Sequence, residues 1–279
     1  MKLYHHPAST VSRMVMLFAA EEGIALDYVL VDLMSGAQHQ PEYKAINPNE
    51  LVPVLDDDGF VLTESAAILR YLAGKSGSRA YPAELQARAR VDEAMAWFYG
   101  NYYKDYAYGL VYPQLFPHHK RPSEQGHADA IAWGRKQSLR WLGVLDAHFL
   151  GRGNAWLCGD TITLADYVGV EMVTLGELVG CTLKDFPNVC AWIGRMKALP
   201  HWDEVHQAYE GFKASLAGKE FVAICGVAFS GPGRNVPVAG AFRDARCSSD
   251  IIVEAATSAQ GSSGYASLCC PRRFLLVGT

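Results

Sequence analysis

A proline inside an apolar run constrains the fold of this chain more than any other feature. The run is Val52-Pro53-Val54-Leu55, and it is followed by three aspartates and Gly59. Because proline has no backbone N–H, it cannot lie inside a fully bonded sheet and has to mark the start of a strand or a special turn. Only X-Pro bonds adopt the cis form at modest cost, so Val52-Pro53 is also a candidate cis peptide.

The residues after this proline predict a hairpin and then a helix. Asp58-Gly59 lies between two apolar runs, which is typical of a tight β-turn. Glu64-Ser65 then precedes residues 66–73, where apolar side chains recur at helical spacing. The start of a helix offers unpaired N–H groups and a partial positive charge, which together form an anion site.

The first 75 residues predict an α/β domain. A β-prone segment at residues 3–6 precedes a helix that begins at Ser12 and stops at Gly23, and a buried strand follows at residues 27–32. The right-handed crossover rule makes these two strands parallel. With the hairpin, the order is β-α-β-(loop or short helix)-β-β-α, which matches a thioredoxin-like fold.

Beyond a linker rich in glycine and serine, the sequence predicts helices alone. Residues 84–116 carry a dense aromatic stripe, and the prolines at 113, 117 and 122 break the helical pattern before a second long helix at about 123–150. Thr163 and Asp166 have the spacing of a capping box at the start of a third helix. Further helices are expected at residues 187–199 and 201–209.

These patterns predict two domains and a tail. A thioredoxin-like α/β domain occupies residues 1–76, and an all-α domain occupies residues 84–218. The tail, residues 225–279, contains no lysine or tryptophan and has glycine-rich and serine-rich interruptions. Its composition favours a disordered or aberrant extension, and a regulatory tail that uses its cysteines is the functional alternative.

Several motifs resemble, in the same order, those of the soluble glutathione transferases. Asn47-Pro48, Val52-Pro53 and Glu64-Ser65 are similar to the glutathione-binding half of that family. The capped segment at Thr163 is similar to a motif in the core of the family's second domain, where its role is folding. The resemblance runs from Lys2 to about Ile224.

A serine near the N-terminus is the candidate catalytic residue. Residues 4–13 resemble the active-site segment of theta-like serine enzymes, with Ser9 at the catalytic position. Position alone would favour a structural role for a serine in such a turn, but together with the downstream motifs it favours the catalytic role. Ser12 is the second candidate, and capping the helix is the commoner role for a serine placed there. Neither residue is a cysteine, which argues against a thiol-disulfide oxidoreductase.

The chemistry follows from the properties of thiols. A free thiol has a pKa of about 8.5, so only a few per cent is thiolate near pH 7, and the thiolate is the nucleophile. Lowering that pKa by about two units requires roughly 2.7 kcal/mol. One charge-assisted hydrogen bond from a hydroxyl and the positive end of a helix can supply most of it. Ser9 would therefore stabilise glutathione thiolate and would not itself attack.

The resemblance implies three anchors for glutathione as co-substrate. Val52, held by Pro53, offers backbone N–H and C=O groups to the cysteinyl portion. Glu64 offers a carboxylate to the α-amino group, and Ser65 with its helix-start N–H groups suits the γ-glutamyl carboxylate.

The third anchor, for the glycyl carboxylate, is less well defined by the sequence. Either Gln38 or His39 occupies the expected position, depending on a one-residue shift in alignment. The lysine that the family often carries just before Val-Pro is Leu51 here, which removes one expected polar contact.

Composition excludes several other classes of protein. A net charge of −4 does not indicate binding to nucleic acid or to an anionic membrane surface. The sequence has no apolar stretch of about 18 residues and no secretory signal, so a cytoplasmic location is expected. Its seven cysteines form no C-x-x-C set, and the pairs His5-His6 and His118-His119 lack helical metal-site spacing. We treat these histidines as polar surface or loop residues and expect no metal.

The leading hypothesis is a theta-like glutathione transferase that acts in detoxification. It would be a homodimer that conjugates glutathione to a small hydrophobic electrophile, with dehalogenase or peroxidase activity as options. Some of the aromatic residues at 97–112 would line the electrophile pocket. The alternative is a non-catalytic glutathione-transferase-like binding or regulatory module, which retention of Ser9 and Glu64-Ser65 disfavours.

Overall fold

The computed structural model describes residues 1–224, so the expected tail at 225–279 lies outside the described residues. The N-terminal part contains a four-stranded sheet of order β2-β1-β3-β4. The strands are β1 (Lys2–His5), β2 (Asp27–Leu30), β3 (Val54–Asp57) and β4 (Phe60–Leu62). β1 and β2 run parallel, whereas β3 is antiparallel to both β1 and β4. The thioredoxin-like order of elements is thereby confirmed.

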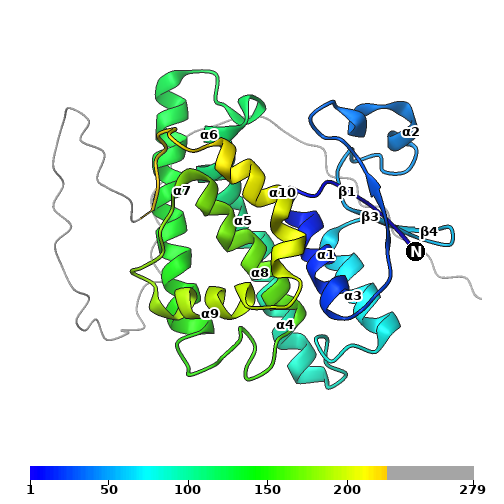
Figure 1. Ribbon diagram of the computed structural model, residues 1–279. Helices are drawn as coiled ribbons and strands as arrows, with labels where there is room; N and C mark the ends of the chain where they lie inside the picture. The colour runs from blue at the N-terminus through cyan, green and yellow to red at the C-terminus, as the bar shows by residue number, and fades with distance from the viewer. Residues whose placement is uncertain (225–279) are drawn as a thin grey trace, which may run out of the picture. The chain divides into compact units, whose positions relative to one another are not determined.

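Two helices complete this part of the chain. Helices α1 (Thr10–Glu21) and α3 (Ser65–Ser76) lie side by side next to the sheet (Figure 1). Leu3, Leu55, Phe18 and Ile68 are fully buried where the sheet and these helices meet. The connection from β2 to β3 carries two short turns of helix, η1 (Ala37–His39) and α2 (Pro41–Lys44).

The hairpin and the special proline are both as the sequence predicts. The Val52-Pro53 peptide bond is cis. Asp57 pairs with Phe60, which leaves Asp58 and Gly59 as a two-residue loop with φ values of 52° and 94°. Positive φ at both positions is what a tight hairpin turn of this kind requires.

Strand β2 departs from the expectation. It pairs in parallel with β1 as predicted, but it is not buried, since Tyr28 is 47% exposed and Leu30 is 61% exposed. The reason is its position at the edge of the sheet, with β1 as its one neighbour in that sheet. An apolar composition predicts a strand but does not predict its place in the strand order.

The rest of the described chain is helical, as expected for an all-α second part. Its α-helices are α4 (Leu85–Trp97), α5 (Tyr103–Asp105), α6 (Tyr112–Leu115), α7 (Glu124–Val144), α8 (Leu164–Thr174), α9 (Pro187–Lys197) and α10 (Trp202–Ser215). Wide π-type turns occur at Phe98–Tyr102, Tyr106–Val111 and Leu145–Phe149, and 3-10 turns at Pro117–His119 and Leu175–Val179. The domain boundaries at 76 and 84 stay a prediction.

Two details of the helical prediction are wrong. Pro113 does not end a helix but lies at the start of α6, which directly follows the π-type turn at Tyr106–Val111, and wide turns of this kind accommodate proline within a helix. The last helix, α10, runs to Ser215 and is longer than the predicted 201–209.

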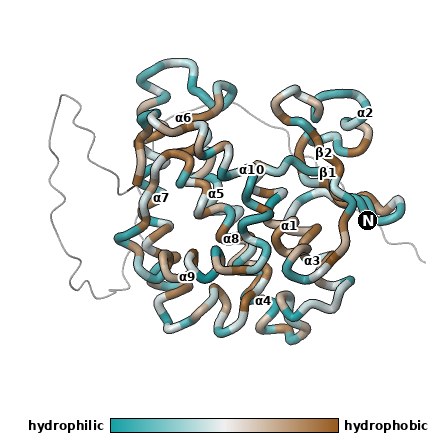
Figure 2. The backbone as a smooth tube through the Cα atoms, viewed as in Figure 1, coloured by the Kyte–Doolittle hydropathy of each residue, from teal (hydrophilic) through white to brown (hydrophobic). Residues whose placement is uncertain are grey.

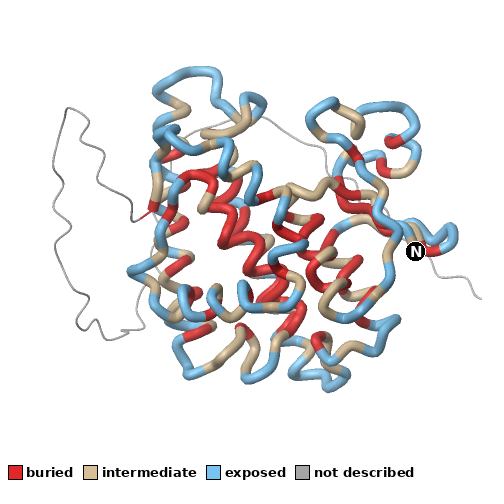
Figure 3. The backbone as a smooth tube through the Cα atoms, viewed as in Figure 1, coloured by how far each residue is buried: buried red, intermediate tan, exposed pale blue. Residues whose placement is uncertain are grey.

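Helix α8 is the centre of the helical core. Every one of its residues is buried, and it is apolar along most of its length (Figures 2 and 3). The predicted capping box is present at its start, because Asp166 Oδ2 accepts from Thr163 N at 2.8 Å. Asp166 Oδ1 accepts from Leu157 N and from Trp192 Nε1, each at 2.9 Å. One buried carboxylate thus joins the start of α8 to the preceding loop and to α9.

We predict that Asp166→Asn lowers the free energy of unfolding by about 3 kcal/mol or more. The amide would turn an N–H group toward donors that now face carboxylate oxygen, and unsatisfied buried groups cost about 1–3 kcal/mol each. Urea unfolding of the variant measures this loss. Asp160→Asn, at an exposed aspartate six residues earlier, is the control and should change stability little. Equal stabilities of the two variants would contradict the role assigned to Asp166.

Candidate functional site

Ser9 caps the N-terminus of α1. Its backbone is extended, and its Oγ accepts a hydrogen bond from Ser12 N at 3.4 Å. The helix therefore begins at Thr10 and not at Ser12, because Ser9 has the backbone conformation and the side-chain contact of the cap. Since the N–H of Ser12 uses a lone pair of the oxygen, the hydroxyl hydrogen of Ser9 remains available to a ligand.

Ser12 lies inside the helix, and its expected capping role is wrong. Its side chain is fully buried, and its Oγ has no hydrogen-bond partner among the described residues. A buried hydroxyl that faces the core is poorly placed to meet a ligand. The geometry therefore favours Ser9 over Ser12.

The sheet register brings the cis-proline loop to the Ser9 segment. Tyr4 of β1 pairs with Val54 of β3, and the two strands are antiparallel. Val52-Pro53, just before Val54, therefore lies beside the chain that leaves β1 toward Ser9. Val52 is buried, but within residues 1–224 its backbone N–H and C=O carry no protein hydrogen bond. Such unpaired groups next to a strand can bind an extended peptide.

The loop before the proline is held by two side chains, of Tyr43, which sequence reasoning did not select, and of Asn47, which belongs to a motif of the resemblance but was given no role in the site. Tyr43 Oη and Asn47 Nδ2 each donate to the carbonyl of Leu51 at 2.7 Å. Asn47 Oδ1 also accepts from Asn49 N at 3.0 Å. The side chain of Leu51 itself is 61% exposed, so this residue contributes its fixed backbone position. The Asn47-Pro48 dipeptide, typical of a turn, was the available signal for this role.

Glu64 and Ser65 form the N-terminal end of α3. Glu64 is the exposed cap residue with a φ of 68°, and Ser65 is the first helical residue. No protein acceptor within the described chain takes the N–H groups of Ser65 and Ala66, so they are available to an anion.

Tyr99 from the helical part reaches this end of α3 and was not singled out from the sequence. Its hydroxyl lies 2.6 Å from Ser65 Oγ, and it also approaches Met14 Sδ at 3.5 Å. Burial, partly opposed by the hydrogen bond to Ser65, raises the pKa of Tyr99 to about 12, so the phenol is neutral at pH 7. Tyr99 thus fixes the orientation of the Ser65 hydroxyl.

Gln38 and His39, the two candidates for the glycyl carboxylate, belong to one exposed polar cluster. Gln38 Nε2 lies 3.0 Å from His39 Nε2, and His39 Nδ1 forms an ion pair with Glu50. Lys44 Nζ lies 3.0 Å from the other carboxylate oxygen of Glu50. Hydrogen bonds from His39 and Lys44 lower the pKa of Glu50 below its usual range. This carboxylate therefore already pairs with the His39 ring and with the Lys44 ammonium group.

The tyrosine stripe divides into a core part and a surface part. Tyr102 and Tyr106 are fully buried, and Tyr106 Oη donates to Val173 O at 3.2 Å. Tyr103, Tyr108 and Tyr112 pack edge to face with one another. Tyr108 and Tyr112 can contribute to a pocket, because Tyr108 is exposed and Tyr112 is partly so, whereas Tyr103 is buried with its hydroxyl 2.6 Å from that of Tyr112.

The expectation that His5 is a surface or loop residue is wrong. His5 lies in β1, is buried, and packs edge to face on Tyr28. Burial first, and the neighbouring His6 second, lower the pKa of His5. Within residues 1–224 no three His, Cys, Asp or Glu side chains come together as metal ligands would. None of the helices described is long and apolar enough to cross a membrane.

Together these features define a class of protein. A thioredoxin-like sheet is joined to a helical region, and two helix N-termini and an unpaired backbone segment surround one edge of it. Such an arrangement suits an extended ligand that carries carboxylates.

Comparisons with known proteins agree. Residues 1–74 match the family model of the glutathione S-transferase N-terminal domain, and residues 110–200 match that of the C-terminal domain. Glutathione S-transferase theta-2 of Rattus norvegicus is 34% identical over 201 residues, covering 71% of this chain and 81% of that protein. Theta-2 of Homo sapiens is 34% identical over 203 residues, with the same coverage.

Two solved structures are similar as well. A delta-class glutathione transferase of Nilaparvata lugens has a TM-score of 0.68 and 32% identity, over 77% of this chain and 97% of that one. Human glutathione transferase theta-2, in complex with glutathione and an unknown ligand, has a TM-score of 0.68 and 30% identity, over 79% and 92%. This chain belongs to the glutathione S-transferase family, with theta-class members among its relatives.

We predict that Ser12→Ala leaves the ionisation of bound glutathione unchanged. Since the Ser12 hydroxyl is buried without a partner, its removal should also leave the free energy of unfolding unchanged or raise it by about 1 kcal/mol. Thiolate absorbance and urea unfolding measure the two effects. A loss of thiolate at pH 7 would contradict the preference for Ser9.

Proposed function

We propose that this protein is a glutathione transferase in which Ser9 stabilises the thiolate of bound glutathione. The observation that carries the proposal is the geometry of Ser9, whose hydroxyl hydrogen is available at the positive end of α1. Family membership and the theta-class relatives support the activity.

Two effects of the protein favour the ionised sulfur. A hydrogen bond from Ser9 Oγ to the thiolate is charge-assisted, and the partial positive charge of α1 adds to it. His6 does not supply a positive charge near pH 7, because burial, partly opposed by Asp32, lowers its pKa. The remaining contributions come from the neutral donor and the helix.

The backbone and the α3 N-terminus supply the anchors for the rest of the tripeptide. In this proposal the free N–H and C=O of Val52 pair with the cysteinyl portion, as in the addition of a strand. The free N–H groups at Ser65 receive the γ-glutamyl carboxylate, and the exposed Glu64 receives the α-amino group. Pro53 holds Val52 in position.

The cluster around Glu50 receives the glycyl carboxylate. Lys44 is an exposed cation, His39 offers an exposed ring N–H, and Gln38 adds an amide donor. Glu50 now pairs with His39 and Lys44, so the incoming carboxylate has to compete with it. Exposed ion pairs contribute about 1 kcal/mol or less, so the exchange is feasible.

The electrophile is a small hydrophobic molecule in this proposal. Tyr108 and Tyr112 supply an aromatic surface with hydroxyl groups for it. With an organohalide, the sulfur would form a bond to carbon while the carbon–halogen bond breaks, and the halide would leave with the electron pair. Dehalogenase and peroxidase activities remain options within this mechanism. Location in the cytoplasm and a role in detoxification also belong to the proposal.

A homodimer is part of the proposal as well. Phe60 and Val61 of the edge strand β4 are exposed apolar residues, 51% and 45% accessible, that a second copy could cover. Light scattering of the purified protein measures the oligomeric state, and a monomer would exclude this element of the proposal.

We predict that Ser9→Ala raises the thiol pKa of bound glutathione toward that of the free thiol, by about one unit or more. Absorbance of the thiolate between pH 5 and 9, in wild type and variant, measures the shift. Loss of a helix cap also costs about 1 kcal/mol of stability. Ser123→Ala is therefore the matched control, because Ser123 caps α7 by accepting from Gly126 N at 3.1 Å.

The outcome separates catalysis from simple binding. An unshifted thiol in wild type would exclude the thiolate mechanism and support the non-catalytic module instead. An equal shift in the two cap variants would show that helix stability, and not the Ser9 hydroxyl, controls the thiol.

We predict that Glu50→Gln lowers the KM for glutathione about two- to fivefold, since the ion pairs that compete with the incoming carboxylate are removed. The thiol pKa should not change. Initial rates at varied glutathione concentration provide the measurement. Glu42→Gln is the control, as Glu42 is an exposed carboxylate in α2 with no partner among the described residues. A higher KM for Glu50→Gln alone would mean that Glu50 helps to bind glutathione.

A further inference from the structure

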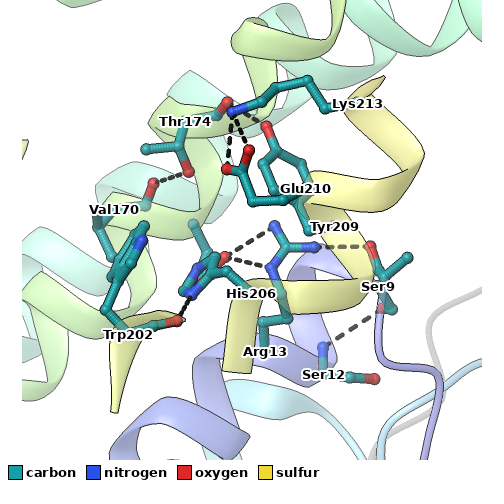
Figure 4. Close-up of polar contacts among 12 residues, drawn as sticks. Ser9, Ser12, Arg13, Val170, Thr174, Trp202, His206, Tyr209, Glu210 and Lys213 are labelled. Carbon is teal, nitrogen blue, oxygen red and sulfur yellow. Dashed lines mark hydrogen bonds and ion pairs between the residues drawn. The ribbon is translucent and has the colours of Figure 1, made fainter. Parts of the chain in front are cut away.

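Three helices bury ionisable side chains against one another behind the Ser9 segment. Arg13 of α1 and Glu171 of α8 are fully buried, and His206 of α10 is 1% exposed. Figure 4 shows Arg13 and His206 close together, with Ser9 on the far side of Arg13. Burying a charge is costly unless partners offset the loss of solvation, and a buried ion pair is often no more stabilising than an apolar replacement. Stability alone therefore does not explain why these three residues are buried together.

The guanidinium of Arg13 faces two parts of the molecule. Its Nε donates to Glu171 Oε2 at 2.8 Å, and Nη2 lies 2.8 Å from the same oxygen. Its Nη1 donates to the backbone carbonyl of Ala8 at 2.7 Å. Ala8 immediately precedes Ser9, so one rigid side chain joins the carboxylate of α8 to the segment that carries the candidate donor.

His206 completes the set from the other side of the carboxylate. Its Nδ1 lies 2.7 Å from the carbonyl of Trp202, and since a carbonyl only accepts, Nδ1 carries a hydrogen. Its Nε2 lies 2.8 Å from Glu171 Oε1 as an ion pair, and that approach is favourable when a proton lies between the two atoms. The imidazole also stacks on the Trp202 ring, with centroids 3.6 Å apart.

The surroundings contain few other charges. The ring of Tyr209 lies 4.1 Å from Arg13 Cζ, and its hydroxyl donates to Thr174 O at 2.7 Å. Burial raises the pKa of Glu171, but the charges of Arg13 and His206 outweigh it and hold that pKa below its usual range. Lys213, further along α10, pairs with Glu177 and Glu210. The carboxylate of Glu171 is thus ionised between two donors.

We propose that Arg13, Glu171 and His206 are positioning residues that set the place of Ser9 relative to the glutathione sulfur. The inference rests on the proposed function of Ser9. Helices α8 and α10 fix the carboxylate, the carboxylate fixes the guanidinium, and the guanidinium holds the Ala8 carbonyl. The packing of the helical part is thereby connected to the thiolate donor through four contacts within the protein.

Two substitutions test the proposal in the full chain. Arg13→Lys keeps the charge, but an ammonium group lacks the planar fork that serves Glu171 and the Ala8 carbonyl together. We expect a rise of about one unit in the thiol pKa of bound glutathione, a tenfold change in its ionisation constant, and a lower kcat with little change in the KM for glutathione. Glu171→Gln should act in the same direction.

The matched control is Glu177→Gln. Glu177 also pairs with two cations, Lys197 and Lys213, but no hydrogen bond or ion pair within residues 1–224 links it to Arg13 or to the Ser9 segment. This variant should lose thermal stability while its thiol titration stays that of wild type. If Glu171→Gln does not fold, Arg13→Lys alone decides the question.

The outcomes are distinct from those of the proposed function. If wild type does not ionise glutathione, the proposed function and this inference both fail. If wild type ionises glutathione and folded Arg13→Lys has the same titration and the same kcat, the proposed function survives and the positioning role is overturned. A thiol shift in Glu177→Gln equal to that in Arg13→Lys would also overturn it.

Discussion

A carboxylate cannot be buried without donors, and α8 buries two of them. Asp166, at the start of α8, accepts hydrogen bonds from the preceding loop and from Trp192 of α9. Glu171, near the middle of α8, forms ion pairs with Arg13 of α1 and His206 of α10. Apolar packing would allow these helices to slide relative to one another, whereas each carboxylate accepts donors only from particular directions. The position of α1 beside the helical core therefore depends on Glu171, and that of α9 depends on Asp166.

On the side of the sheet, backbone pairing and backbone donors place the parts of the candidate site relative to one another. The antiparallel pairing of β1 with β3 brings the cis-proline loop next to the segment that leads to Ser9. Tyr43 and Asn47 fix the carbonyl of Leu51, which leaves the groups of Val52 unpaired. The N-termini of α1 and α3 then offer free N–H groups. The candidate site is built mainly from backbone donors, which suits an extended ligand with carboxylates.

Much of this arrangement could be predicted from local patterns. The hairpin, the cis-proline, the parallel pairing of β1 and β2, and the capping box of α8 each depend on a few neighbouring residues. The errors concern burial and helix ends. Ser12 was expected to cap α1, but Ser9 does so, and β2 was expected to be buried, but it lies at an edge. Tyr99, far from Ser65 in sequence, gave no signal because its partner is set by tertiary packing.

The sequence by itself determined the order of strands and helices along the chain and the class of fold. It also determined that a serine, and not a cysteine, lies near the start of α1. Those properties follow from turn residues, proline and apolar periodicity, which act over a few positions. Only the tertiary structure decided that Arg13 bonds to Glu171 and to the Ala8 carbonyl. It also decided that Glu50 pairs with His39 and Lys44, next to Gln38. The physical reason is that a charged side chain takes its partner from whatever the fold brings within about 3 Å, and sequence spacing does not encode that distance.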